Sequence, residues 1–515
     1  MKTAATLFFA FAFICNAYSN TWNIGPTRTY TLPSQVKNLV QNGDTIYLDE
    51  STYVNDATKW TKNNLSFIGL GSGAVLQYTG DIPNGKGIWV FESPGSSDDA
   101  YIENIIFDGA QVSDNDGGNG AGIRFQAKNL TINHCKFMNC QNGILEGHGS
   151  VTTSNVSIRN CEFQNNGYQL QDDPQYSGYE HNIYISASTE VLFVVNCYFH
   201  HPRGQGNSLK TRAQQSYILY NLIDEEDSGY GSWELNIAQG GLNVIMGNVI
   251  IQGTSGANHG IISYDAAINV LEDFYFVNNT VINKYGGNAR FFNISPASGI
   301  NTFKLYNNIF ASVPGASNTL FSGNIPTILD TSHNVWINDF QSAGFTDPDT
   351  DDYSLTEDAI SMINKGTGAG LTNTNYSLKP VKMYVSFNTV LQPRVIIDGI
   401  IDIGAYEFQG TTGLDEIDSK SKISIFPNPF TSKIEISITT EGHHDVSIYI
   451  FDALGQNMFK ENIFKENMFQ ENMFSSSRKL EVDLTPYPPG IYFVVCYLDG
   501  RQFTRIIAKQ TVYHE

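Results

Sequence analysis

The feature that most constrains this chain is an internal repeat that becomes explicit near residue 130. Its spacing runs from 25 residues, between Asn196 and Asn221, to 36 residues, between Asn160 and Asn196. A strand–helix–strand unit needs more room, so the spacing favours a coil of three short strands. Coils stacked about 4.8 Å apart pile equivalent residues into columns, which a β-sandwich would not give in this register. The repeat therefore predicts an all-β fold, a parallel β-helix with the usual right-handed winding. The aligned positions are His134, Asn160, Asn196, Asn221, Asn248, Asn279 and Asn307.

The residues around the aligned position predict what fills each coil. Four residues earlier stand Leu130, Val156, Leu192, Tyr217, Val244, Tyr275 and Phe303. Three residues later stand Phe137, Phe163, Phe199, Asp224, Ile251, Ile282 and Phe310, which we interpret as an inward column. The Asn column suits a turn, because Asn tolerates left-handed backbone and its amide can bond to neighbouring coils. The thiols of Cys135, Cys161 and Cys197 follow it as a small apolar column.

The N-terminal part of the sequence predicts export. Residues 1–19 resemble a secretory signal, with Lys2, the apolar run Leu7 to Cys15, and the small-x-small site Ala17-Tyr18-Ser19. No later segment is apolar enough for a membrane span. The net charge of −21 argues against nucleic acid as a partner. We expect the β-helix domain over residues 20–410, and a monomer.

The C-terminal part has a different pattern. A linker rich in Gly, Thr, Asp, Ser and Lys is expected over 411–421, and alternating strands predict a small β-sandwich over 422–515. Within it, a nearly five-residue period over 457–474 is read as a repeat expansion in a hairpin loop. The motifs Phe426-Pro427-Asn428-Pro429-Phe430, Ile450-Phe451-Asp452-Ala453-Leu454-Gly455 and Pro488-Pro489-Gly490-Ile491-Tyr492-Phe493 resemble the type A sorting domain of the type IX secretion system. That resemblance implies export across the outer membrane by this machinery, to the medium or the cell surface.

A short strand around Lys210 carries the candidate site. Leu209 and Thr211 fall on one face, and Ser208, Lys210 and Arg212 fall on the other, because side chains alternate along a strand. Two cations on one strand of an acidic protein are unusual. Stacking by register gives three outward columns: Glu146, Tyr184, Lys210, Asn236 and Ser263; His148, Ser186, Arg212, Ala238 and Asp265; and Asn182, Ser208 and Glu234. The preceding loops would wall a groove with aromatic rims from Tyr168, Tyr176 and Tyr179.

A second resemblance rests on the strand and its neighbours. The run from His181-Asn182-Ile183-Tyr184 through Lys210-Thr211-Arg212-Ala213 to Gly240-Gly241 is similar to a widespread group of secreted right-handed β-helix proteins. That group pairs a Lys-Ser-Arg-Ala strand with a later Gly-Gly. Here Thr211 replaces the Ser, and Asn207 stands where a His is expected. The group resembles in fold the polysaccharide lyases that act on pectate and alginate.

Lyase chemistry gives a reason for placing Lys and Arg together. β-Elimination removes the proton alpha to a uronate carboxylate, so a cation must neutralise that carboxylate and a base must reach the proton. Arg212 would be the neutraliser, Lys210 the base and Tyr184 the acid that protonates the leaving oxygen. His181, Asn182, Glu146, Glu234 and Asn236 are the candidate substrate-binding residues.

Other functions stay open. Both cations could merely pair with Glu234, Glu146 or Asp224 on a solvated face. Separately, the protein could be a glycan-binding surface protein without catalysis. A glycoside hydrolase needs two carboxylates across the scissile bond, and Glu146 with Glu234 is the candidate pair. We expect no cofactor and leave calcium open without a clear motif for it, because the acidic run 345–352 lacks the central Gly and closing Glu of a calcium loop. His200 with His201 lacks a third metal ligand, which favours a surface position.

Overall fold

The computed structural model describes residues 19–92, 99–147, 152–167, 178–396, 399–408, 422–427, 430–440, 446–452, 457–463, 476–498 and 501–509. The chain forms two compact units. The first runs to residue 339 and includes 369–380 and 384–392, and the second comprises 340–368, 381–383 and 393–515. No helix among the described residues is long and apolar enough to cross a membrane. The signal segment 1–18 and the linker lie outside the described residues, and the predicted domain bounds stay predictions.

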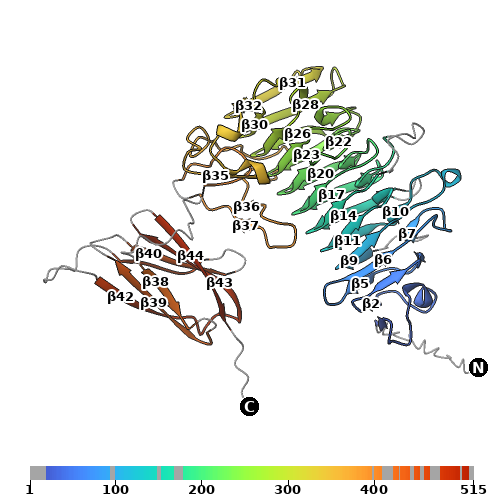
Figure 1. Ribbon diagram of the computed structural model, residues 1–515, viewed down its shortest axis with the longest axis horizontal. Coiled ribbons are helices and arrows are strands. Elements are labelled where there is room, and N and C mark those ends of the chain that lie inside the picture. The colour runs from blue at the N-terminus through green and yellow to red at the C-terminus, as the bar shows by residue number, and fades with distance from the viewer. Residues whose placement is uncertain are drawn as a thin grey trace, which may run out of the picture. The chain divides into compact units, whose positions relative to one another are not determined.

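The first unit is a right-handed parallel β-helix of three sheets, in which every pairing is with the next coil (Figure 1). Sheet A has twelve strands: β1 (Thr21–Ile24), β2 (Thr45–Leu48), β5 (Leu65–Gly69), β8 (Asp99–Glu103), β11 (Asn129–Asn133), β14 (Thr153–Arg159), β17 (Thr189–Val195), β20 (Gln215–Leu219), β23 (Gly241–Met246), β26 (Glu272–Val277), β29 (Thr302–Tyr306) and β32 (Leu329–Ser332). Sheet B has eleven: β3 (Thr52–Val54), β6 (Ala74–Gln77), β9 (Ile105–Asp108), β12 (Lys136–Met138), β15 (Glu162–Gln164), β18 (Tyr198–His200), β21 (Leu222–Asp224), β24 (Val249–Gln252), β27 (Thr280–Asn283), β30 (Ile309–Ser312) and β33 (Val335–Ile337). Sheet C has ten: β4 (Thr58–Trp60), β7 (Gly87–Glu92), β10 (Ala121–Gln126), β13 (Asn142–Glu146), β16 (Ile183–Ile185), β19 (Leu209–Thr211), β22 (Leu235–Ile237), β25 (Gly260–Tyr264), β28 (Asn288–Ile294) and β31 (Ser317–Gly323).

The inward columns form one continuous core. Ile183, Leu209 and Leu235 are register partners on successive strands of sheet C and are fully buried, as the repeat predicted. On sheet B the rings of Phe107, Phe137, Phe163 and Phe199 stack nearly parallel, with centroids 4.8 to 5.0 Å apart. Each Phe of this column thus packs against the equivalent Phe of the neighbouring coils, which gives a physical reason for one residue type along a column.

The alignment read from the sequence is wrong by one residue in three middle coils. Asn196 is followed in its column by Tyr220, Gly247 and Asn278, and the alignment regains register at Asn307. The same shift replaces Asp224, Ile251 and Ile282 by Ile223, Ile250 and Val281 in the inward column of sheet B. In the structure, the column of Cys135, Cys161 and Cys197, one position later than the Asn196 column, continues with Asn221, Asn248 and Asn279. There the side-chain oxygen of Asn248 accepts a hydrogen bond from the backbone of Asn221 at 2.9 Å, and each later Asn repeats the contact.

The shift has a physical cause in the outer face of sheet A. Tyr217, Val244 and Tyr275 point outward, yet they are buried in a cluster with Ala369 and Leu378. These last two belong to a return segment, residues 369–380 and 384–392, which packs on this face of sheet A. Because both faces of these strands are apolar, the period-two pattern no longer tells inside from outside.

The second unit contains the C-terminal sandwich. One antiparallel sheet has β38 (Lys422–Phe426), β39 (Lys433–Thr440) and β42 (Ser476–Asp483). The other has β41 (Asn457–Ile463), β40 (Val446–Asp452), β43 (Gly490–Leu498) and β44 (Arg501–Lys509). Ile436 from the first sheet and Ile450 from the second share one buried cluster, which confirms the expected sandwich. The start of the five-residue repeat is strand β41, paired with β40, whereas a loop was expected. The rest of that repeat lies outside the described residues.

Upstream in this unit, the acidic run 345–352 forms a tight antiparallel turn. Strand β34 (Phe345–Asp347) pairs with β35 (Asp352–Leu355). A pair of two-residue strands, β36 (Lys382–Met383) and β37 (Gln392–Pro393), is also present. The three sheets of the β-helix therefore end at Ile337, and the described residues of 340–408 form other structures.

Candidate functional site

A cleft of about 1180 Å³ lies over the outer face of sheet C. Its described lining includes Lys210, Arg212, Tyr184 and His181 from the predicted site. Gly117 and Asn119 come from the loop before β10, and Gly178 and Tyr179 come from the end of the loop before β16. Tyr179 is largely exposed and supplies an aromatic rim, whereas Tyr168 and Tyr176 lie outside the described residues.

Local packing fixes the backbone that directs the Lys210 and Arg212 side chains outward. Thr211 is fully buried, and its hydroxyl accepts a hydrogen bond from the backbone of Ala213 at 3.1 Å, which fixes the bend that follows Arg212. In the next coil Gly241 has φ of 99°, and a Cβ there would lie 2.8 Å from the carbonyl oxygen of Ala213. The glycine is therefore required for close passage of the next coil, which accounts for the pairing of the Lys-Thr-Arg-Ala strand with the later Gly-Gly.

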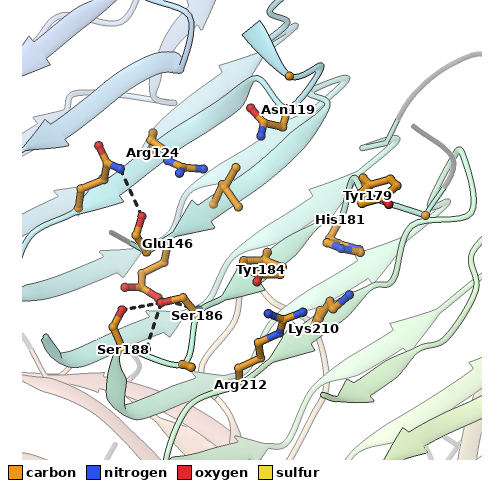
Figure 2. Close-up of a pocket in the computed structure, with 16 residues that line it drawn as sticks. Asn119, Arg124, Glu146, Tyr179, His181, Tyr184, Ser186, Ser188, Lys210 and Arg212 are labelled. Atoms are coloured by element: carbon orange, nitrogen blue, oxygen red, sulfur yellow. Dashed lines mark hydrogen bonds between the residues drawn. The ribbon is translucent and has the colours of Figure 1, made fainter. Parts of the chain in front are cut away.

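Tyr184 stands beside both cations (Figure 2). It is the register partner of Lys210, and Arg212 follows in the same turn of the coil. The Lys210 Nζ lies 5.8 Å, and the Arg212 Cζ 5.4 Å, from the centroid of the Tyr184 ring. The structure thus brings together the three residues that sequence reasoning assigned to catalysis.

Both cations lack a neutralising partner in the described part of the cleft. No described carboxylate forms an ion pair with Lys210 or Arg212, and the Arg212 Nε is buried without a hydrogen-bond partner. Glu234, Glu146 and Asp224 do not serve as their counter-ions. Burial lowers the pKa of Lys210, the adjacent Arg212 lowers it further, and Asp265 acts in the opposite direction. Half-buried, unpaired cations of this kind are suited to an anionic ligand.

His181 is a neutral hydrogen-bond donor. Its Nδ1 accepts a hydrogen bond of 2.9 Å from the backbone N–H of Asn207, so the ring proton is on Nε2. Burial lowers the pKa of His181 well below its usual value, and Lys210 and Arg212 lower it further. The ring stacks on Tyr184 with centroids 5.8 Å apart. Because His181 lines the cleft, its Nε2–H is a donor available to a ligand hydroxyl or carboxylate.

Glu146 does not occupy the column in which it was expected. Leu145 is the register partner of Tyr184, and Glu146 pairs one position later, with Phe125. Its side chain is buried and accepts hydrogen bonds from the hydroxyls of Thr153 and Thr189 and from the backbone of Ser186, at 2.6 to 2.9 Å. Its carboxylate is therefore bound by the protein itself at the cleft wall.

Three other predicted residues are not among the described cleft lining. Asn182, Glu234 and Asn236 are each at most 2 % exposed, although an exposed outer face was expected. Asn182 accepts a hydrogen bond from Asn166, and Asn236 donates one to Asp265. Burial, together with Glu225 and Asp224, raises the pKa of Glu234 well above its usual value. Strand alternation alone does not reveal that these positions are buried.

Arg124 is a charged residue of the cleft that sequence reasoning missed. It lies on β10, in register with Leu145, and thus in the same outward column as Tyr184 and Lys210. The signal was present, because strand 121–126 is one coil before β13. The sequence alignment placed Glu146 instead of Leu145 in the column of Tyr184 and Lys210, so Arg124 was not recognised as a member of that column.

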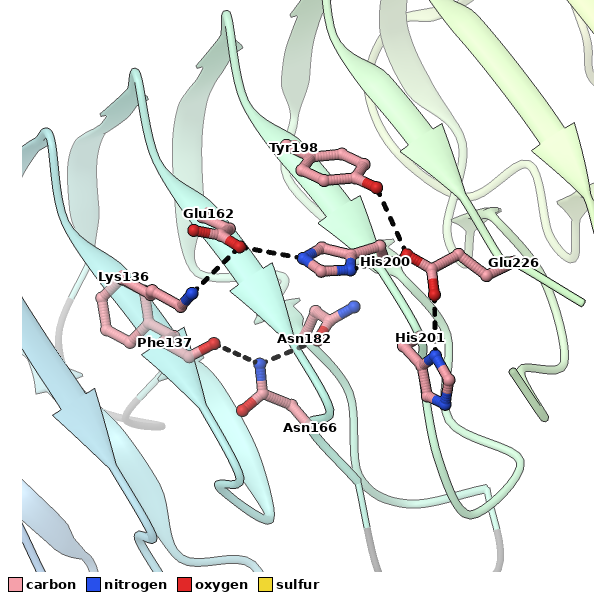
Figure 3. Close-up of polar contacts among 9 residues, drawn as sticks. All are labelled: Lys136, Phe137, Glu162, Asn166, Asn182, Tyr198, His200, His201 and Glu226. Carbon is pink, nitrogen blue, oxygen red and sulfur yellow. Dashed lines mark hydrogen bonds and ion pairs between the residues drawn. The ribbon is translucent and has the colours of Figure 1, made fainter. Parts of the chain in front are cut away.

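A second polar cluster lies on sheet B (Figure 3). The His200 ring is 2.8 Å from Glu226 and 3.0 Å from Glu162, so each ring nitrogen faces a carboxylate. Burial alone would lower the pKa of His200, but the two carboxylates raise it above its usual value. His200 is 7 % exposed, whereas a surface position was expected. The described residues contain no group of three or more His, Cys, Asp or Glu side chains arranged to hold a metal.

Comparison with known proteins bears on export. The curated proteins give no match. Residues 424–510 match the model of the secretion system C-terminal sorting domain, which confirms the type IX sorting domain expected from its motifs. The C-terminal region therefore interacts with the secretion machinery, and the protein is exported, either to the medium or to the cell surface.

Proposed function

We propose that this protein is a polysaccharide lyase that cleaves a uronic-acid-containing glycan by β-elimination. The observation that carries the proposal is that Lys210 and Arg212, which form no ion pair with a described carboxylate, lie beside Tyr184 in the cleft. In a chain of net charge −21, such a pair is well matched to a carboxylate ligand. Export to the medium or surface places the cleft where extracellular polymers occur.

Each residue has one role in the proposed reaction. The guanidinium of Arg212 binds the uronate carboxylate with two parallel hydrogen bonds, and its charge stabilises the enolate-like intermediate. Neutral Lys210 takes the proton alpha to the carboxylate. The C–O bond at the beta carbon then breaks, a C=C bond forms, and Tyr184 O–H protonates the leaving oxygen. Proton return from the Lys210 ammonium to the Tyr184 phenolate through solvent resets the site.

The arrangement favours elimination over hydrolysis. Among the described residues that line the cleft, Glu146 is the one carboxylate, and its oxygens are occupied by protein donors. The candidate partner, Glu234, is buried away from that lining. A hydrolase needs one carboxylic acid and one carboxylate on opposite sides of the bond. A binding protein without catalysis remains the competing function.

The test is the Lys210→Ala variant with a panel of uronic-acid and neutral glycans, measuring unsaturated products and reducing ends. Wild type should give unsaturated products, and the variant should lose about 100- to 10,000-fold in rate, the usual contribution of a general base. Its free energy of unfolding should change by about 1 kcal/mol or less, since no ion pair is removed. Lys136→Ala on sheet B is the matched control and should keep full activity.

The outcomes separate the alternatives. Reducing ends without unsaturation would indicate a hydrolase. Glycan binding without any product from wild type would indicate a binding protein. Full lyase activity in Lys210→Ala would remove Lys210 from the mechanism.

A further inference from the structure

Arg124 is a third cation without a counter-ion on the described part of the protein. Its Nε is buried without a hydrogen-bond partner, and its guanidinium lines the cleft. Burial lowers its pKa, while Glu146, Tyr184 and Glu92 act in the opposite direction. Neither carboxylate is available to it. Glu92 is paired with Lys59 and Lys86, and Glu146 accepts its hydrogen bonds from Thr153, Ser186 and Thr189.

The position of Arg124 relative to the other two cations is fixed by the sheet. The outward column runs Arg124, Leu145, Tyr184, Lys210 on four successive strands of sheet C. Three strand spacings separate Arg124 from Lys210, or roughly 14 Å along the β-helix axis. Figure 2 places Arg124 on the far side of Tyr184 from Lys210 and Arg212. Between these charged ends the floor is formed by Leu145 and Tyr184, which offer apolar surface to a sugar ring.

From this geometry we infer that Arg124 binds a second carboxylate of the same polymer. This inference rests on the proposed function and extends it to the substrate class. A 1,4-linked pyranose chain advances, per sugar, by a length close to one strand spacing. A chain lying along the axis therefore presents to Arg124 a carboxylate about three sugars from the one held by Arg212. The substrate is then a polyuronate with carboxylates at regular intervals, and a single uronate in a neutral glycan would not use both ends of the cleft.

The inference makes Arg124 a positioning residue, remote from the bond that breaks. Arg124→Gln removes the charge and keeps much of the side-chain volume. On a long polyuronate the variant should raise KM about 10- to 100-fold, as expected for the loss of a charge-assisted pair, with kcat almost unchanged. On oligouronates too short to span the two ends, variant and wild type should be equal. Arg159→Gln, on the outer face of sheet A, is the matched control.

Binding measurements separate this inference from the proposed function. Polygalacturonate and polymannuronate would be titrated into Lys210→Ala and into Lys210→Ala/Arg124→Gln, in which turnover is slowed enough for binding to be measured. A loss of about 10-fold or more in affinity for at least one polymer, with a shallower salt dependence, is expected. Equal affinities, or no binding of either polymer, would overturn the role of Arg124 even if wild type is a lyase. A loss of affinity without unsaturated product from wild type would overturn the lyase and leave Arg124 as a polyuronate contact. Should Arg124→Gln unfold, Arg124→Lys replaces it: this variant keeps the charge, and an intermediate loss is expected because the two-pronged contact is removed.

Discussion

At the scale of single residues, the pKa of Lys210 can be changed by a substitution outside the described cleft lining. Burial and Arg212 lower its pKa, and Asp265 raises it. Asp265 accepts a hydrogen bond from Asn236 and is not part of the described cleft lining. Asp265→Asn keeps that geometry and removes the charge. The pKa of Lys210 should then fall further, and the rising limb of the lyase pH–rate profile should move to lower pH.

The measurement is kcat/KM as a function of pH for both proteins. Because the base acts when neutral, activity rises as pH passes upward through the Lys210 pKa, so a lower pKa moves the limb in the acid direction. Asp330→Asn, which removes a carboxylate from the ion pair with Lys304, is the control and should leave the profile in place. A limb that moves to higher pH would contradict the assignment of Lys210 as base.

Sequence reasoning placed part of the candidate site on the outer face for a clear reason. Alternation along a three-residue strand was enough to place Lys210 and Arg212 outward over buried Leu209 and Thr211. It failed for Glu146 and Glu234, which were expected to face solvent and are buried. Glu146 is held by Thr153, Ser186 and Thr189 of other coils, and no local pattern encodes such contacts.

At the scale of elements, the stacked Phe column of sheet B supports the coils that carry the site. Phe163 is fully buried between Phe137 and Phe199, at 5.0 and 4.8 Å. Phe163→Ala should reduce the free energy of unfolding by about 3–5 kcal/mol, because a rigid column leaves a cavity. Urea unfolding followed by circular dichroism measures this loss. Phe193→Ala, half-buried on the outer face of sheet A, should cost clearly less, and equal losses would show that the column has no special rigidity.

The strands themselves were predictable, whereas their register was not in every coil. Columns of one residue type predicted the parallel β-helix and the inward position of Leu209 and Leu235. The one-residue error at Asn221 arose where an apolar outer face mimics an inner one. The return segment that covers that face, residues 369–380 and 384–392, is distant in sequence and carries none of the repeat.

At the scale of the whole molecule, we expect the sorting domain to direct export and to take no part in the proposed reaction. Deleting residues 422–515 in the native host should abolish release or surface attachment, because the segment matched by the sorting-domain model is lost. Immunoblots of medium, surface and internal fractions measure the distribution. Unchanged extracellular protein would contradict the role of this domain in export.

The return segment also has a consequence for the order in which the first unit folds. Contacts between successive coils join residues about one repeat apart, but Asn196 bonds to the backbone of Thr389 across 193 residues, and Tyr275 to Asn373 across 98. Coils can therefore close one after another as the chain emerges, whereas contacts over such separations form late. Until residues 369–380 and 384–392 have been synthesised, the apolar and aromatic outer face of sheet A is exposed to solvent. We therefore expect the chain to be most prone to aggregation, or to chaperone binding, before the return segment has packed on sheet A.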